Sequence, residues 1–198
     1  MRILDILAGR TKPAQANLDA LFGLPSAFIT LEASEAMVPS GEAGVCYKPA
    51  SGQPFARTTE ELESLLGLGG GPTRVREETD HYGFHWVVLG PGSGPSDPQE
   101  LVNQVHLVNT TLQEQGFGPQ LLCSVFGFRP AKEPAGSPAN TYLVYLYKRG
   151  TFYPFMPLAG REQRAVEAEL RWSVELAEDL KIEKDKANWM ALWGLPVH

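Results

Sequence analysis

The chain has 198 residues, 43% of them hydrophobic, with 17 basic and 23 acidic side chains and a formal net charge of −6. The hydrophobic content is sufficient for a buried core, and the acidic balance argues against nucleic acid as a partner, because phosphate binding needs a clustered basic surface. No stretch approaches the roughly 18 consecutive apolar residues of a membrane-spanning helix. We therefore expect a cytoplasmic protein that folds as a single domain over residues 1–198.

The N-terminal stretch MRILDILAGRTKP predicts a short amphipathic helix that ends before its proline. Its apolar run is interrupted by Asp5 and lacks a small-residue cleavage site, so it does not resemble a secretory signal. Two interpretations stay open: the helix packs on the body of the domain, or residues 1–13 detach and contact a partner or the inner face of the cell membrane. The candidate contact residues are Ile3, Leu4, Leu7, Arg10 and Lys12.

Three further elements are predicted before residue 50. Asn17 caps a short helix over residues 17–24. Apolar and polar residues then alternate over 26–34, which predicts a strand. A turn at residues 39–41 leads to a second strand over 42–49.

The middle of the chain predicts two helices and a β-hairpin. Capping residues at Thr58 and Glu61 predict a helix over residues 58–71. Residues 73–90 predict a hairpin that turns near 81–83. Asp97 then supplies a cap, and Pro98 and Glu100 a suitable first turn, for a helix that closes at Gly116.

The last third predicts a strand over residues 119–130 and a second hairpin over 141–157. A helix over about residues 160–180 follows, with one apolar stripe opposite a charged face. The stripe consists of Val166, Leu170, Val174 and Ala177. Trp189 and Trp193 are four residues apart, so we expect them to share a helix face and to hold this end of the chain on the sheet.

These elements predict an α+β fold. Strands come in hairpin pairs separated by helices, which favours a mainly antiparallel sheet of about six or seven strands with helices packed mostly on one face. A parallel, doubly wound sheet would need regular alternation of strands and helices, which is absent.

The stretch DHYGFHW is the best candidate for a site with chemistry. Asp80, His81 and His85 could ligate a metal ion, with His106 as a distant fourth ligand. The two histidines straddle the expected turn, and no HExxH or CxxC motif accompanies them. We therefore expect no enzyme activity, no metal and no cofactor.

The two cysteines, Cys46 and Cys123, are too few for a disulfide framework and have no metal-binding spacing. Each lies in an apolar, strand-like run. We expect both to be buried free thiols.

Blocks at both ends of the chain carry a family resemblance. Near the start these are GRTKP at residues 9–13, NLDALF at 17–22 and LPSA at 24–27. Near the end they are FYPF at 152–155, the charged helix after it, and LWGLP at 192–196. Together they resemble the PspA-associated protein PspAB family over nearly the whole chain.

The resemblance implies an accessory role toward PspA, the membrane-remodelling coiled-coil protein of the phage-shock envelope-stress response, and no enzymatic activity. We therefore expect a non-enzymatic protein that acts on PspA through protein–protein contact, with peripheral membrane contact and a homodimer left open. Two alternatives also stay open. One is a secretion-chaperone-like binding module, which an antiparallel sheet with flanking helices and an acidic surface would suit. The other is a metal-dependent hydrolase that uses Asp80, His81 and His85.

Overall fold

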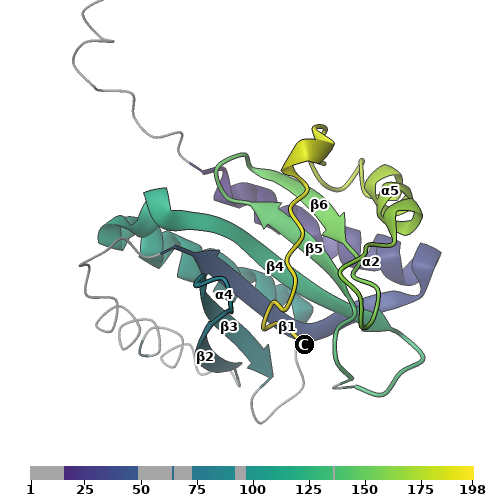
Figure 1. Cartoon of the computed structure of the whole chain (residues 1–198), viewed down its shortest axis with the longest axis horizontal. Helices are drawn as coiled ribbons and strands as arrows, with labels where there is room; N and C mark the ends of the chain where they lie inside the picture. The colour runs from purple at the N-terminus through teal and green to yellow at the C-terminus, as the bar shows by residue number, and fades with distance from the viewer. Residues whose placement is uncertain (1–15, 49–63, 65–72, 92–96, 136) are drawn as a thin grey trace, which may run out of the picture.

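The computed structural model describes residues 16–48, 64, 73–91, 97–135 and 137–198. Within these ranges one antiparallel sheet contains the strands β1 (Met37–Tyr47), β2 (Thr73–Thr79), β3 (His85–Pro91), β4 (Leu121–Pro130), β5 (Thr141–Leu146) and β6 (Thr151–Phe155). The order across the sheet is β2-β3-β1-β4-β5-β6, so the two longest strands, β1 and β4, pair at its centre (Figure 1).

Two predicted features lie outside the described residues. One is the N-terminal segment with its candidate contact residues Ile3, Leu4, Leu7, Arg10 and Lys12. The other is the helix expected over residues 58–71, of which only residue 64 is described. Both stay predictions.

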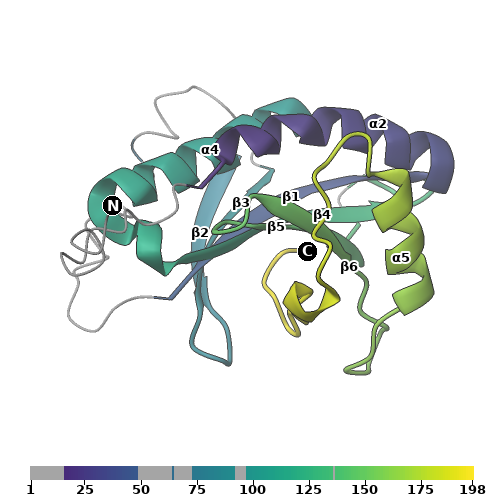
Figure 2. The ribbon, with the colours of Figure 1, turned by 90° about the horizontal axis from the view of Figure 1, so that it is seen from above.

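Helices cover one face of the sheet. The 3₁₀ helix η1 (Leu18–Gly23) leads directly into α2 (Leu24–Glu35), and α4 (Pro98–Leu112) follows β3. Figure 2 shows α2 and α4 in one layer over the sheet, with α5 (Val166–Glu175) at the β6 side. None of the helices in the described ranges has the length and apolar content needed to cross a membrane.

The alternation of side chains along the strands divides the buried residues between the two faces. The core on the helix side contains Val45, Val87, Phe126, Leu143 and Phe152, among others. The opposite face presents Cys46, Trp86, Val125, Val144 and Tyr153. Because both faces are apolar, both must be covered to exclude water.

The second face is covered by residues 186–198, which we call the C-terminal segment and which runs across the sheet (Figures 1 and 2). Trp189 stacks on Tyr153 with ring centroids 5.8 Å apart, and Trp193 meets Phe155 at 5.3 Å. The prediction that the two tryptophans hold this end of the chain on the sheet is confirmed. They do not share a helix face, because only the short 3₁₀ helix η4 (Lys186–Asn188) precedes them.

Side chains satisfy much of the backbone of the C-terminal segment, which has little regular structure of its own. Arg164 donates from Nη1 to the Trp189 carbonyl at 2.6 Å, and Arg76 donates from Nη2 to the Pro196 carbonyl at 2.7 Å. The His198 N–H donates to Glu42 Oε2 at 2.8 Å. These bonds fix the path of the segment at both of its ends.

The predicted α+β class, with a mainly antiparallel sheet, is confirmed, but the predicted strand over 26–34 is wrong. These residues belong to α2, in which Ala27, Phe28 and Leu31 are buried while Ile29 is 71% exposed. That spacing is helical, and Pro25 lies in the first turn, where it starts a helix instead of ending one.

The predicted turn at residues 39–41 is also wrong. The chain does not reverse there, because β1 begins at Met37 and continues through these residues. The pairing of β1 with β4 shifts register between Pro39 and Ala43, and Gly41 has a φ of 97°. The glycine therefore marks an irregularity inside a strand. Both predicted hairpins and the Asp97-capped helix are present as expected.

The helix predicted over 160–180 is shorter, and its apolar stripe does not face the core. Val166, Leu170 and Val174 are 55%, 43% and 76% exposed, and Ala177, beyond the end of α5, is exposed too. The buried side of α5 instead carries Glu169 and Trp172, with Trp172 edge-on to Phe128 at 5.6 Å. A tryptophan buries more apolar area than a valine or leucine, and this decides the orientation of the helix.

Replacing Trp189 by alanine tests the role of the C-terminal segment as the cover of the second face. We expect Trp189→Ala to lower the free energy of unfolding by about 3–5 kcal/mol, the usual cost of deleting a buried tryptophan. The neighbouring Met190 is 60% exposed, so Met190→Ala serves as the control and should change this free energy by about 0.5 kcal/mol or less. Urea denaturation measures both. If the two substitutions lowered the free energy of unfolding equally, the C-terminal segment would not be part of the folded unit.

Glu183 makes the stability of this region depend on pH. Its side chain is 3% exposed, and hydrogen bonds from Arg149, from the Asp185 N–H and from Thr151 lower its pKa from 4.5 to about 2. The unfolded chain therefore binds a proton between these values that the folded protein does not. We expect the free energy of unfolding to fall as the pH drops from 4.5 toward 2, and Glu183→Gln to remove this part of the fall. Urea midpoints over a pH series measure it, and an unchanged slope in the variant would contradict it.

Candidate functional site

A cavity of about 320 Å³ lies on the sheet face that the C-terminal segment covers. The strands supply the side chains of Cys46, Trp86, Cys123 and Tyr153, and the C-terminal segment supplies residues 190–193 and Leu195. The hairpin turn between β2 and β3 supplies Asp80, Tyr82 and Phe84. We call this space the apolar cavity.

The turn between β2 and β3 is organised by the Asp80 carboxylate. Oδ1 accepts hydrogen bonds from the N–H groups of Tyr82 at 2.9 Å and Phe84 at 3.0 Å, and Oδ2 accepts one from Trp86 Nε1 at 3.0 Å. Gly83 adopts a φ of 81°, which a glycine tolerates best. These contacts orient three aromatic residues along one wall of the cavity.

The two thiols lie side by side at the sheet surface of the cavity. Cys46 and Cys123 are direct partners in the β1–β4 register, and their side chains are 3% and 6% exposed. Contact with the Cys123 thiol and burial both raise the pKa of Cys46. The prediction of two buried free thiols is confirmed.

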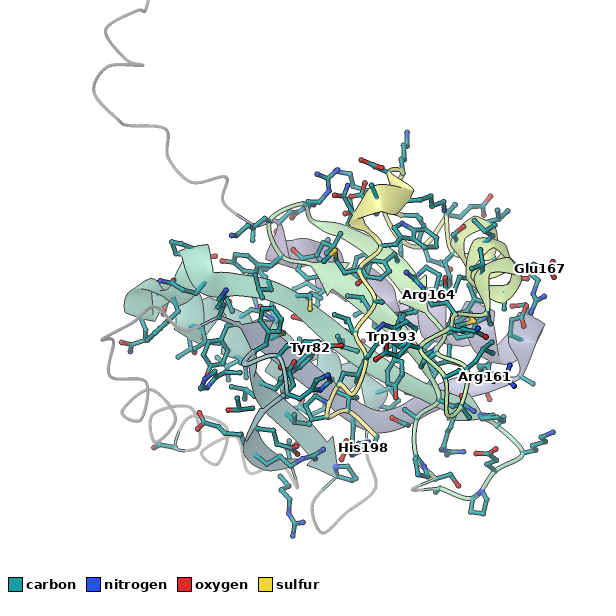
Figure 3. The ribbon with its side chains drawn as sticks, viewed as in Figure 1. Tyr82, Arg161, Arg164, Glu167, Trp193 and His198 are labelled. Atoms are coloured by element: carbon teal, nitrogen blue, oxygen red, sulfur yellow. The ribbon has the colours of Figure 1, made fainter. Side chains whose placement is uncertain are left out.

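Trp193 also borders a second hollow, of about 520 Å³, on its other side. Residues 157–162, between β6 and α5, line this hollow together with His81 and Tyr142. Figure 3 shows Trp193 over the sheet, with Tyr82 to one side and Arg161 to the other. The tryptophan therefore stands between two open spaces.

The structure does not bring together the predicted metal ligands. The His81 ring lies against Tyr82 at 3.8 Å, whereas His85 lies against Tyr47 at 5.5 Å. The distant candidate, His106, stacks on Phe22 at 4.9 Å. Among the residues that the structure describes, no three His, Cys, Asp or Glu side chains are placed to hold a metal ion. The geometry of Asp80 thus supports a structural role in the turn.

The exposed stripe of α5 is a second candidate site. Val166, Leu170 and Val174 repeat every four residues along this helix and are exposed. Polar contacts fix α5 beside α2: Arg171 pairs with Glu35, with Nη2 to Oε2 at 3.0 Å, and this arginine lowers the pKa of Glu35. We call the three aliphatic residues the α5 stripe.

Sequence reasoning singled out part of the apolar cavity for another reason. DHYGFHW was selected as a metal candidate, yet it contributes Asp80, Tyr82, Phe84 and Trp86 to the cavity wall. The aromatic residues of this stretch, and not its histidines, indicated that it lines a cavity. The other wall residues come from distant strands and from the C-terminal segment, and no local spacing links them.

The fold and the site define an α+β protein with an open antiparallel sheet and an apolar cavity beneath its C-terminal segment. The chain belongs to the PspAB family, whose model, described as PspA associated protein B, matches residues 1–197. The family indicated by the two end blocks is therefore confirmed. No curated protein and no solved structure matches the chain.

The two thiols give a direct test of the geometry of the apolar cavity. The thiolate is the reactive form, so a raised pKa slows reaction with thiol reagents. The pKa of Cys46 is raised, and both thiols are buried away from reagent. We therefore expect the chain's 2 cysteines to react slowly with Ellman's reagent at neutral pH in the folded protein, and both to react rapidly in denaturant. Absorbance at the thionitrobenzoate band measures both rates. Rapid labelling of the folded protein would contradict the arrangement.

Proposed function

We propose that this chain is a non-enzymatic accessory protein of the PspA system that acts through protein–protein contact. Its membership of the PspAB family is the observation that carries the proposal. The family description names an association with PspA. A contact partner requires an accessible surface that gains from burial, and the α5 stripe is such a surface.

The α5 stripe has the pattern of a helix that docks onto another helix. Its residues are at positions i, i+4 and i+8, so they lie on one side over two turns of α5. Full burial of an exposed aliphatic side chain contributes about 1.5–3 kcal/mol. These three side chains are already partly buried and would contribute less, so they would form the apolar centre of a larger contact. The exposed charged residues Glu167 and Arg171 flank the stripe and would form a polar rim. A coiled-coil PspA would offer a matching helical surface.

The N-terminal segment is a second part of this proposal. Arg10 and Lys12 would add electrostatic attraction to an anionic membrane, at about 1 kcal/mol for each basic residue near the surface. In the helix predicted from the sequence, the apolar face of Ile3, Leu4 and Leu7 would be too small to hold a protein on a bilayer alone. We propose that PspA contact and membrane contact act together.

The α5 stripe can be tested with substitutions that leave the core intact. We expect Leu170→Glu and Val174→Glu, together, to weaken binding to the PspA of the same organism at least tenfold, because two charges would enter an apolar contact. Isothermal titration calorimetry measures the dissociation constant. Leu107→Glu is the matched control, because Leu107 is an exposed leucine on α4, away from the stripe.

Flotation with anionic vesicles, with and without PspA, tests the N-terminal part separately in a variant that lacks residues 1–12.

Absence of binding between the full chain and its PspA would contradict the proposed function. Equal loss in Leu107→Glu and the stripe variant would contradict the assignment of the contact to α5. The secretion-chaperone-like module remains the alternative, and it would require that a client other than PspA binds.

A further inference from the structure

We propose that the apolar cavity is a binding site for a small, uncharged, hydrophobic ligand. The inference concerns a site that the PspA contact does not use, since the α5 stripe lies on α5 and shares no residue with the cavity lining. It therefore goes beyond the proposed function and stands independently of it.

The size of the cavity selects the size of the ligand. At about 320 Å³ it falls in the lower part of the range of ligand pockets. It is about twice the ~150 Å³ of an apolar protein cavity that holds one benzene ring. A molecule of two or three rings, or an aliphatic chain of similar volume, fits it. A peptide segment with its backbone does not.

Several polar atoms of the cavity wall already have hydrogen-bond partners within the protein. The Asp80 oxygens accept three hydrogen bonds, one of them from Trp86 Nε1. The Tyr153 hydroxyl donates to the Met190 carbonyl at 2.9 Å. A buried water needs two or more polar partners, so water in this cavity would be poorly held and easily displaced by an apolar group.

The charge of the wall argues against an anionic ligand. Asp80 contributes the one ionisable carboxylate among the described lining residues, and no basic side chain lines the cavity there. Contact with Cys123 and burial raise the pKa of the Cys46 thiol, so Cys46 contributes no negative charge to the wall. An anion would meet the Asp80 carboxylate among mostly apolar side chains, in a medium of low polarity, which is unfavourable. An uncharged molecule avoids this cost.

The rim of the cavity gives a route for entry. Tyr82 and Met190 both line the cavity and are 54% and 60% exposed. Tyr82 lies on the hairpin turn and Met190 on the C-terminal segment, so the opening lies between two separate parts of the chain. A methionine side chain is flexible and adapts to ligands of different shape.

A matched pair of fluorescent probes tests size and charge together. N-phenyl-1-naphthylamine is uncharged, and 1-anilinonaphthalene-8-sulfonate carries the same ring system with a sulfonate. We expect the uncharged probe to bind the full chain saturably with a stoichiometry of one, and the sulfonate to bind at least tenfold more weakly. Fluorescence titration, with excitation of the protein tryptophans, measures both, because Trp86 and Trp193 line the cavity.

Two substitutions in the cavity lining locate the bound probe, and a third substitution elsewhere is their control. Ala191 lines the cavity and is exposed, so Ala191→Trp adds bulk at the rim without disturbing the core. Ala131 is also exposed but follows β4, away from the cavity, and Ala131→Trp is the control. Leu122→Trp fills the cavity from its wall, with circular dichroism to confirm folding. We expect both cavity variants to weaken binding of the uncharged probe at least tenfold, with Ala131→Trp unchanged.

Three outcomes would overturn the proposal. The first is non-saturable binding of the uncharged probe. The second is equal affinity in the folded Leu122→Trp variant and the control. The third is equal affinity for the two probes, which would remove the requirement for an uncharged ligand. Because PspA is absent from the titration, failure here leaves the proposed function unaffected.

Discussion

The sheet of this protein is apolar on both faces. Both faces must therefore be covered, and the other elements of the structure are arranged to cover them. On one side, helices provide regular cover, with their own backbone bonds already made. On the other side the cover is the C-terminal segment, which is too irregular to satisfy its own backbone. The arginines at 76 and 164 donate to its carbonyls, and Glu42 accepts from its last N–H. The two arginines are structural, since without them the partly buried carbonyls of Trp189 and Pro196 would lose these partners.

A narrow covering segment also explains why open space occurs where it does. A helix would bury a broad strip of the sheet, whereas the extended segment touches it through a few side chains, which are Trp189, Trp193, Leu195 and Val197. Spaces remain on both sides of Trp193. The apolar cavity is thus a consequence of how the second face is covered, and its hydrophobic character follows from that of the sheet. The α5 stripe has a different origin, because Trp172 turns the larger apolar surface of that helix inward.

The sequence predicted best those elements whose signals are local. Asp97 and Pro98 define the start of α4, and glycines near 83 and 150 mark the two hairpins. It failed for α2, where Ala27 and Leu31 fit both a strand and a helix, and the neighbours Phe28 and Ile29 decide between them only after packing. The prediction failed for α5 because the regularly spaced aliphatic residues are exposed, whereas Trp172 is buried. The apolar cavity could not be predicted, since Cys46 and Cys123 meet only through strand pairing.

The position of the covering segment in the chain has a consequence for synthesis. Translation delivers all of the described strands by Phe155, yet the segment over their second face begins only at Lys186. At about 5–20 residues per second, the nascent sheet waits for several seconds with Trp86, Val125 and Tyr153 uncovered. During that interval the aromatic face is an aggregation hazard.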